Sequence, residues 1–295
     1  MSARAPRRER SSSDVAAALR AVRQRYGIDL SDARVRAGFG RGHALELLLH
    51  ARAVQSAVDT AALPAARALL RSSLGPETFD TWVGDVKVAP LRQRSRLKLL
   101  DDASGTPELL DLGELRPCIE AVIAEVRAGL PERPYWQCAA DLPWTMLEVE
   151  PVPSEDPPEQ DDLFLATTAL PEMLKAFLRG EAVRSARFSN HDETFCYLKW
   201  RDGAADAGER MQRRVAVEDA LDAALVRARL GCVVGSGLGL QYTYVHLALI
   251  DTSAASGAIE DVCQRLSTGP GWLLFFDAGA RDRCRSLCGA GDPPG

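Results

Sequence analysis

Apolar positions in the second half of the chain change between the two-residue period of a strand and the wider spacing of a helix. Four segments alternate as strands, and helical spacing separates the first from the second and the third from the fourth. This order predicts a ferredoxin-like βαββαβ domain, in which four antiparallel strands carry helices on one face. The expected strands are Thr194–Trp200, Cys232–Val234, Leu240–Ile250 and Trp272–Phe276, and the expected helices cover 217–228 and 259–266.

A glycine-rich stretch, Gly235-Ser-Gly-Leu-Gly239, lies between the second and third of these strands. A dinucleotide-binding loop would need a glycine at its sixth position, where Leu240 stands, and a helix directly after it. The P-loop motif G-x-x-x-x-G-K-[ST] does not occur in the sequence. We therefore interpret the stretch as a turn, because glycine adopts the positive φ angles that tight turns require. We expect no cofactor.

The first half of the chain has a mainly helical pattern. Beyond Gly75 two short segments, Val86–Val88 and Leu97–Leu99, alternate like strands. Together with the helices around them, they predict a small α-β-β-α unit that follows a helical region. The expected helices are Asp14–Arg25, His43–Val58, a segment that begins at Pro64, and Leu115–Val126.

Charged and proline-rich stretches mark the expected domain boundaries. Residues 149–163 include Pro-Val-Pro-Ser-Glu-Asp-Pro-Pro-Glu-Gln-Asp-Asp, which leaves no apolar face to bury and is typical of an extended acidic linker. The basic stretch 1–13 is expected to be a disordered tail, and 281–295 a second tail. The chain then divides into a helical and small α/β region over 14–148 and a ferredoxin-like α+β domain over 164–280.

The composition is that of a globular protein and argues against two functional classes. The chain has 295 residues, 46% of them apolar, which is enough for two compact cores, and its net charge is −5. Residues 1–150 hold 21 basic and 20 acidic side chains and the remainder hold 15 and 21, so neither half has the basic excess that duplex binding requires. No apolar run reaches the ~18–20 residues that a membrane helix needs.

The ratio of arginine to lysine and the placement of the cysteines indicate the cellular setting, because arginine codons are GC-rich and lysine codons are AT-rich. Arginine outnumbers lysine 32 to 4, which indicates a GC-rich, bacterial genome. The seven cysteines are scattered, often within apolar runs, so we expect free, buried thiols and no disulfide framework. Serines, and not the apolar core of a signal peptide, follow the basic N-terminal residues. These features predict a cytoplasmic protein.

Three side chains of the expected helix over His43–Val58 have the spacing of metal ligands. On a helix, His43, Glu46 and His50 would project within roughly 80° of one another. The zinc motif H-E-x-x-H is absent, however, and such a face is more often solvated. We therefore expect no metal site, and a small metal-dependent enzyme that uses these three residues remains a further hypothesis.

Aromatic residues lie on two strands that a ferredoxin-like sheet would place side by side. Phe195 and Tyr197 share one face of the first strand, and Tyr242 and Tyr244 share one face of the third. The segment Tyr242-Thr-Tyr-Val resembles part of the RNA-recognition motif, in which strand aromatics stack on bases. Leu240-Gln241 replaces the basic opening of that motif, and the domain is acidic. We therefore favour a core or protein-interface role and keep single-stranded nucleic-acid binding as the alternative.

Residues 67–127 resemble the N-terminal domain of the bacterial replication initiator DnaA. The resemblance rests on apolar anchors that include Phe79-x-x-Trp82, the segment Arg96-Leu-Lys-Leu-Leu100 and the helix through Ile119-Glu-Ala-Val-Ile123. In that family the module has a KH-like topology and docks other proteins. The resemblance thus implies a docking module, with Phe79 and Trp82 as candidate interface residues if they are exposed.

These observations predict a non-catalytic protein-interaction or regulatory protein of bacterial type. The sequence contains no complete catalytic constellation, and both expected modules are of kinds that often bind other proteins. The expected partner is an unidentified protein; a single-stranded nucleic acid stays the less favoured alternative, and no membrane is expected. The candidate interaction residues are Phe79, Trp82, Phe195, Tyr197, Tyr242 and Tyr244.

Overall fold

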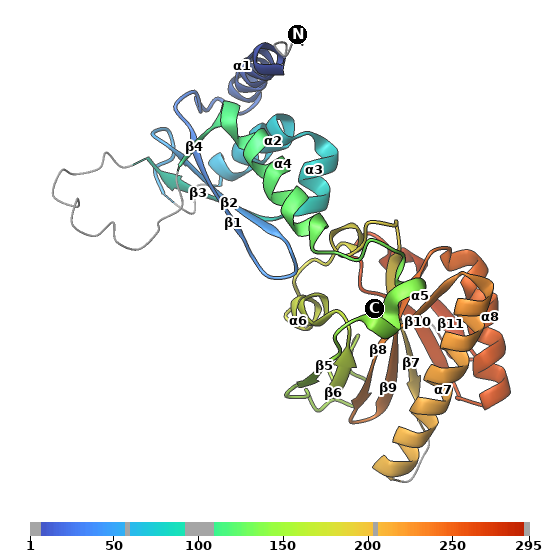
Figure 1. Cartoon of the computed structure of the whole chain (residues 1–295). Helices are drawn as coiled ribbons and strands as arrows, with labels where there is room; N and C mark the ends of the chain where they lie inside the picture. Colours follow the sequence, from blue (N-terminus) through green and yellow to red (C-terminus); the bar gives the residue numbers. More distant parts are fainter. Residues whose placement is uncertain (1–6, 57–59, 92–108, 203–205, 292–295) are drawn as a thin grey trace, which may run out of the picture. The chain divides into compact units, whose positions relative to one another are not determined.

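The computed structural model describes residues 7–56, 60–91, 109–202 and 206–291. The chain forms two compact units, Met1–Val126 and Arg127–Gly295, each with its own core (Figure 1). Both units combine helices with a sheet, so the expected α+β class is confirmed.

The N-terminal unit is built on a four-stranded sheet in the order β3-β2-β1-β4. β1 and β2 form an antiparallel hairpin, and β2 pairs in parallel with β3 after two intervening helices. Figure 1 shows α2, α3 and α4 grouped together beside the sheet. The elements are α1 (Arg7–Tyr26), β1 (Arg34–Phe39), β2 (Leu45–Ala51), α2 (Ala62–Leu74), α3 (Pro76–Trp82), β3 (Val83–Pro90), β4 (Leu110–Asp111) and α4 (Leu112–Ala128).

The expected helix over His43–Val58 is wrong, because this segment forms β2. Leu45, Leu47 and Leu49 all point into the core, whereas Glu46 lies on the outer face. The Leu, Ala and Glu content favours a helix in isolation, but the two-residue alternation fits pairing with both β1 and β3. The expected strand Leu97–Leu99 lies outside the described residues.

The C-terminal unit contains a seven-stranded sheet in the order β11-β10-β7-β9-β8-β6-β5, and every neighbouring pair is antiparallel. Its strands are β5 (Thr145–Glu148), β6 (Leu163–Thr168), β7 (Thr194–Arg201), β8 (Gly231–Gly239), β9 (Tyr242–Leu249), β10 (Gly271–Phe275) and β11 (Arg285–Leu287). Its helices are α5 (Tyr135–Cys138), α6 (Pro171–Leu178), α7 (Ala207–Ala228) and α8 (Thr252–Leu266).

Both faces of this sheet are covered. The four strands expected from the sequence, β7 to β10, are the consecutive members β10-β7-β9-β8 of the sheet. The linking helices α7 and α8 cover one face, with a core that includes Leu221, Leu247 and Ile259. α6 lies on the other face (Figure 1), over a core that includes Phe177, Tyr197 and Tyr244. The expectation of four strands was incomplete, because β5, β6 and β11 extend the sheet at its two edges.

The glycine-rich stretch forms the end of β8, so its interpretation as a turn is wrong. A Cβ added to Gly235 would lie 2.6 Å from His246 Nδ1, and one added to Gly237 would lie 2.4 Å from Leu163 Cδ1. At Gly239 it would lie 2.3 Å from Asp162 Oδ1. The alternating glycines therefore leave space for close approach, which we call the glycine trough. His246 and strand β6 approach Gly235 and Gly237, and Asp162, the last residue before β6, approaches Gly239.

Described parts of the segments expected to be tails or a free linker have regular or buried structure, while residues 1–6 and 292–295 of those tails lie outside the described residues. Residues 149–163 begin exposed, but Gln160 is buried beside His246 and Asp162 is buried against Gly239, so the expected extended linker is wrong for its second half. The end of the chain contributes β11, and α1 already begins at Arg7. The burial of residues 160–162 was not predicted, because it depends on specific hydrogen bonds and not on apolar side chains.

The glycine trough predicts opposite effects for two matched glycine substitutions. Gly239→Ala places a methyl group against the fixed Asp162 carboxylate, and we expect it to destabilise the C-terminal unit by about 2–3 kcal/mol. The control Gly257→Ala lies at an exposed position of helix α8, where the new Cβ meets nothing within 4 Å beyond the helix's own backbone, and should stabilise by about 0.5–1 kcal/mol. Urea denaturation followed by circular dichroism measures both changes. Equal stabilities for the two variants would contradict the trough.

Candidate functional site

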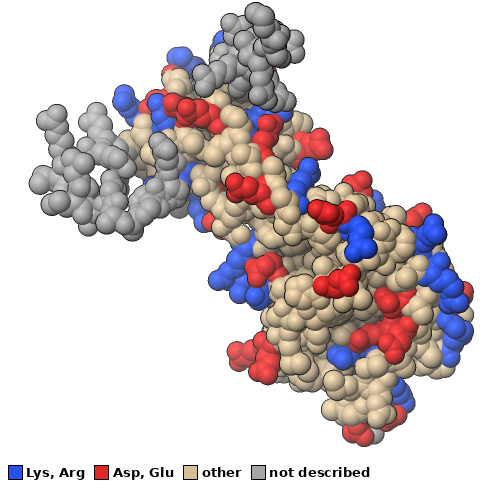
Figure 2. Space-filling view, in the orientation of Figure 1, with Lys and Arg blue, Asp and Glu red and all other residues tan. Residues whose placement is uncertain are grey.

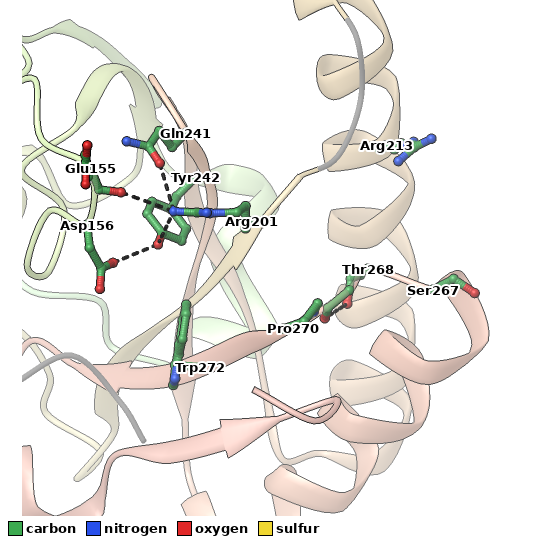
Figure 3. A pocket seen from close by; sticks show the side chains of 11 residues that line it. Glu155, Asp156, Arg201, Arg213, Gln241, Tyr242, Ser267, Thr268, Pro270 and Trp272 are labelled. Atoms are coloured by element: carbon green, nitrogen blue, oxygen red, sulfur yellow. Dashed lines mark hydrogen bonds between the residues drawn. The ribbon is translucent and has the colours of Figure 1, made fainter. Parts of the chain in front are cut away.

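A groove of about 1050 Å³ lies at one end of the C-terminal sheet. β7 ends there, and because β9 and β10 run antiparallel to β7, they begin there. The walls are completed by residues 149–162 before β6, which we call the acidic segment, and by the loop between α8 and β10, as Figure 3 shows. The lining residues are Glu155, Asp156, Arg201, Arg213, Gln241, Tyr242, Ser267, Thr268, Gly269, Pro270 and Trp272.

Tyr242 is the fixed centre of the groove lining. Its ring is buried and contacts the ring of Trp272 edge-on, with centroids 6.1 Å apart. Its hydroxyl donates a hydrogen bond to Asp156 Oδ1 at 2.9 Å and accepts one from Arg201 Nη2 at 3.3 Å. Burial and the hydrogen bond to Asp156 raise the pKa of the phenol, so it stays protonated and keeps donating. The hydroxyl thus holds an acidic and a basic side chain at defined positions.

Arg201 is held in place by neutral acceptors. Its Nη2 also donates to the backbone oxygen of Glu155 at 3.2 Å and to Gln241 Oε1 at 2.9 Å. The guanidinium carbon lies 5.3 Å from the centre of the Tyr242 ring. No carboxylate of the described residues is within ion-pair distance of Arg201, whereas Arg213 pairs with both Asp202 and Glu209. The groove therefore contains one fixed cation whose charge is not neutralised by direct contact.

A buried lysine supports the groove from inside the sheet. Lys199 is fully buried, and its Nζ donates to the backbone oxygen of Pro157 at 2.7 Å and lies 4.2 Å from the Tyr242 ring centre. Burial lowers the pKa of Lys199 to about 8, although nearby acids, led by Asp162 and Asp156, act in the opposite direction. The amine ties the acidic segment to the sheet but is not accessible to a ligand.

Asp162 fixes the end of the same segment to the turn between β8 and β9. Its carboxylate is fully buried and accepts hydrogen bonds from the backbone N–H of Gln241 at 2.8 Å and of Tyr242 at 3.0 Å. It also accepts a hydrogen bond from the hydroxyl of Tyr244. Charged acceptors form the stronger class of hydrogen bond, so this contact holds two walls of the groove in register.

A buried histidine lies further along the same face. His246 has its Nε2 3.3 Å from Gln160 Nε2, and its Nδ1 has no hydrogen-bond partner among the described residues. Its ring also contacts Phe276 edge-on at 5.3 Å. Burial lowers the pKa of His246 to about 3, assisted by the positive charge of Arg214. The imidazole is therefore neutral across the physiological range and acts as a packed core group.

The structure brings together the four aromatics of the expected stacking platform but buries them. Phe195, Tyr197, Tyr242 and Tyr244 are each at most 2% exposed. Helix α6 and the acidic segment cover the face on which they lie, so an open stacking surface is not formed. The burial agrees with the favoured core role and counts against the alternative of base stacking. Only Tyr242 lines the groove.

Phe79 and Trp82 are also core residues. Both are buried in the N-terminal unit, where they pack in one cluster with the leucines of α2. Phe79 and Trp82 lie on the short helix α3, and the i, i+3 spacing that made them conspicuous in the sequence turns both toward the core. They therefore do not form the exposed patch that would mark an interface.

The helix that the further hypothesis of a metal-dependent enzyme requires does not form. His43 lies in the β1–β2 turn with φ of 56°, while Glu46 and His50 lie on β2. Four residues along a strand span about 13 Å, too far for Glu46 and His50 to share one ion. Across the part of the chain that the structure describes, no group of three or more His, Cys, Asp or Glu side chains could hold a metal.

Apart from Tyr242, the groove residues were not identified from the sequence. Arg201 lies at the end of β7 and Trp272 near the start of β10, and neither position has a distinctive local sequence. Asp156 lies in the stretch whose sequence is interpreted as a linker. One usable signal was the repeated glycine at 235, 237 and 239, since alternating glycines in a strand indicate close approach of another segment. The rest depends on which strands become neighbours.

The chain was compared with protein-family models, curated proteins and solved structures, and none of the three gives a match. None of the described helices is both long enough and apolar enough to cross a membrane. The assignment of a function therefore rests on the geometry of the chain itself.

His246 predicts a specific acid sensitivity. The unfolded chain binds a proton near pH 6.5 and the folded chain only near pH 3, so stability falls as the pH drops through this window. From pH 7 to 4.5 we expect the loss to be about 3 kcal/mol larger in the natural chain than in His246→Gln. Urea titrations at each pH measure this difference, with His43→Gln as the control. Parallel pH profiles of the natural chain and His246→Gln would contradict the assignment.

Proposed function

We propose that the chain is a non-catalytic interaction protein whose C-terminal groove binds an extended segment of a partner protein. The observation that carries the proposal is the convergence of fixed side chains from four segments on one open groove. Asp162 binds the backbone of Gln241, and Lys199 binds the backbone of Pro157, so the acidic segment is fixed to the sheet before a ligand arrives. Preorganised lining reduces the entropic cost of binding.

The mixed charge of the groove favours a peptide over a polyanion. Glu155 and Asp156 lie in the same lining as Arg201 and Arg213, so a row of phosphates would meet two carboxylates. Figure 2 shows acidic and basic side chains interspersed, without a broad basic area on the face in view. A polypeptide can present both charges and an apolar side chain for Trp272. The volume is at the upper end of that of small-molecule sites, which leaves room for several residues.

We also infer that the C-terminal unit is an elaborated ferredoxin-like domain. The order β10-β7-β9-β8 and the helices α7 and α8 between these strands support this inference. The additional strands at both edges and the covered second face are departures from that arrangement. In this interpretation the elaborations direct binding to the end of the sheet, because its usual open face is occupied.

For the N-terminal unit, the resemblance to the DnaA docking domain remains a proposal. Helices α3 and α4 and strand β3 are elements of the kinds that the resemblance implies, whereas the segment Arg96–Leu100 lies outside the described residues and Phe79 and Trp82 lie in the core. All seven cysteines are free thiols, which supports the proposal of a bacterial protein in a reducing, cytoplasmic setting.

Selection from a random dodecapeptide library on the full chain tests the proposed groove. We expect enriched peptides to bind the natural chain and Met146→Ala equally, because Met146 is exposed on β5 at the edge of the sheet. Thr268→Trp adds bulk to the groove wall and should weaken binding at least about tenfold, with an unchanged circular dichroism spectrum. Measurement is by fluorescence anisotropy. An absence of enriched peptides, or equal binding to Thr268→Trp, would remove the proposal.

A further inference from the structure

We propose that the groove selects a carboxylate on its peptide ligand, and that Arg201 is the residue that binds it. This inference rests on the proposed function, because it names the chemistry by which the same groove recognises its partner. The ligand is expected to carry an aspartate or glutamate side chain that meets the guanidinium at the end of β7.

The first support is the way in which Arg201 is held. One terminal nitrogen, Nη2, makes all of the side-chain hydrogen bonds of Arg201 to described residues, and their acceptors are an amide, a phenol and a backbone carbonyl. No described residue accepts a hydrogen bond from Nε or Nη1. The guanidinium is thus oriented by neutral groups and by the Tyr242 ring, while Nε and Nη1 have no acceptor among the described residues. A carboxylate can accept a charge-assisted hydrogen bond from either of these nitrogens.

The second support is the contrast with Arg213, the other cation of the groove. Arg213 donates to Asp202 Oδ1 at 3.2 Å and to Glu209 Oε1 at 2.7 Å, so its charge is already compensated. In Figure 3 Arg213 lies apart from the cluster of Arg201, Tyr242 and Asp156. A ligand carboxylate gains more from an uncompensated cation than from one that would have to leave its own partners.

The third support is the separation of charges around Tyr242. The hydroxyl donates to Asp156 and accepts from Arg201, so it lies between them and keeps them from forming a direct ion pair. Glu155 and Asp156 then disfavour multiply charged anions, whereas a single carboxylate can reach Arg201. A basic side chain elsewhere on the ligand would find the two acids. The expected ligand is therefore a peptide with one acidic position near a basic one.

Paired peptide arrays test the carboxylate preference with defined probes. One array carries random hexapeptides with acetylated N-termini and amidated C-termini, and the second carries the same sequences with Asp and Glu replaced by Asn and Gln. We expect the natural chain to bind its best acidic peptides about ten- to a hundredfold more tightly than their amide counterparts. Arg201→Gln should lose this preference, and Arg213→Gln should keep it.

Further measurements make each outcome decisive. Circular dichroism and thermal melting must show that both variants remain folded, and Arg201→Lys should retain a reduced preference because it keeps the charge but loses the planar guanidinium that Gln241 and Tyr242 orient. Equal binding of acidic and amide peptides overturns the carboxylate inference while the interaction function stands. Preference that persists in Arg201→Gln also overturns it. Tight, Arg201-dependent binding of a single-stranded oligonucleotide would replace the peptide with a nucleic acid and would overturn both proposals.

Discussion

The buried carboxylate of Asp162 is the interaction on which the C-terminal unit depends. A charge without solvent is tolerated only where hydrogen bonds replace its hydration, and here the backbone of Gln241 and Tyr242 and the hydroxyl of Tyr244 replace it. The carboxylate can reach these donors only because residue 239 is glycine. One side-chain position thus fixes the β8–β9 turn, the path of the acidic segment and the wall of the groove.

This constraint explains why the aromatic face of the sheet is closed. The segment that ends at Asp162 passes over Lys199 and contacts the hydroxyl of Tyr242, so backbone carbonyls and carboxylates of the chain itself occupy the places that an external ligand would take. The tyrosines satisfy their hydroxyls within the fold, as buried tyrosines usually do. Binding chemistry is then left to the rim, where Arg201 and Trp272 emerge from the ends of β7 and β10.

Much of the fold followed from apolar periodicity, and its failures have identifiable physical causes. The strands β7, β9 and β10 and the helices α7 and α8 were predicted because each buries a continuous apolar set. β2 was mistaken for a helix, because local propensity and tertiary pairing favour different structures for the same leucines. The segment at 149–163 was mistaken for a linker, because hydrogen bonds and a lysine, and not apolar residues, hold it.

The groove was not predicted for a different reason, because it depends on the order of the strands in the sheet. Arg201, Trp272 and Asp156 are far apart in the sequence and belong to no motif, and each has an ordinary local context. They converge because antiparallel pairing places the end of β7 beside the starts of β9 and β10, and because Asp162 directs the acidic segment to that same edge. Apolar periodicity indicates which side of a strand or helix is buried, but the strands that lie next to each other depend on the order of strands in the sheet. Sequence reasoning therefore identifies core residues in such a sheet more readily than the residues at its rim.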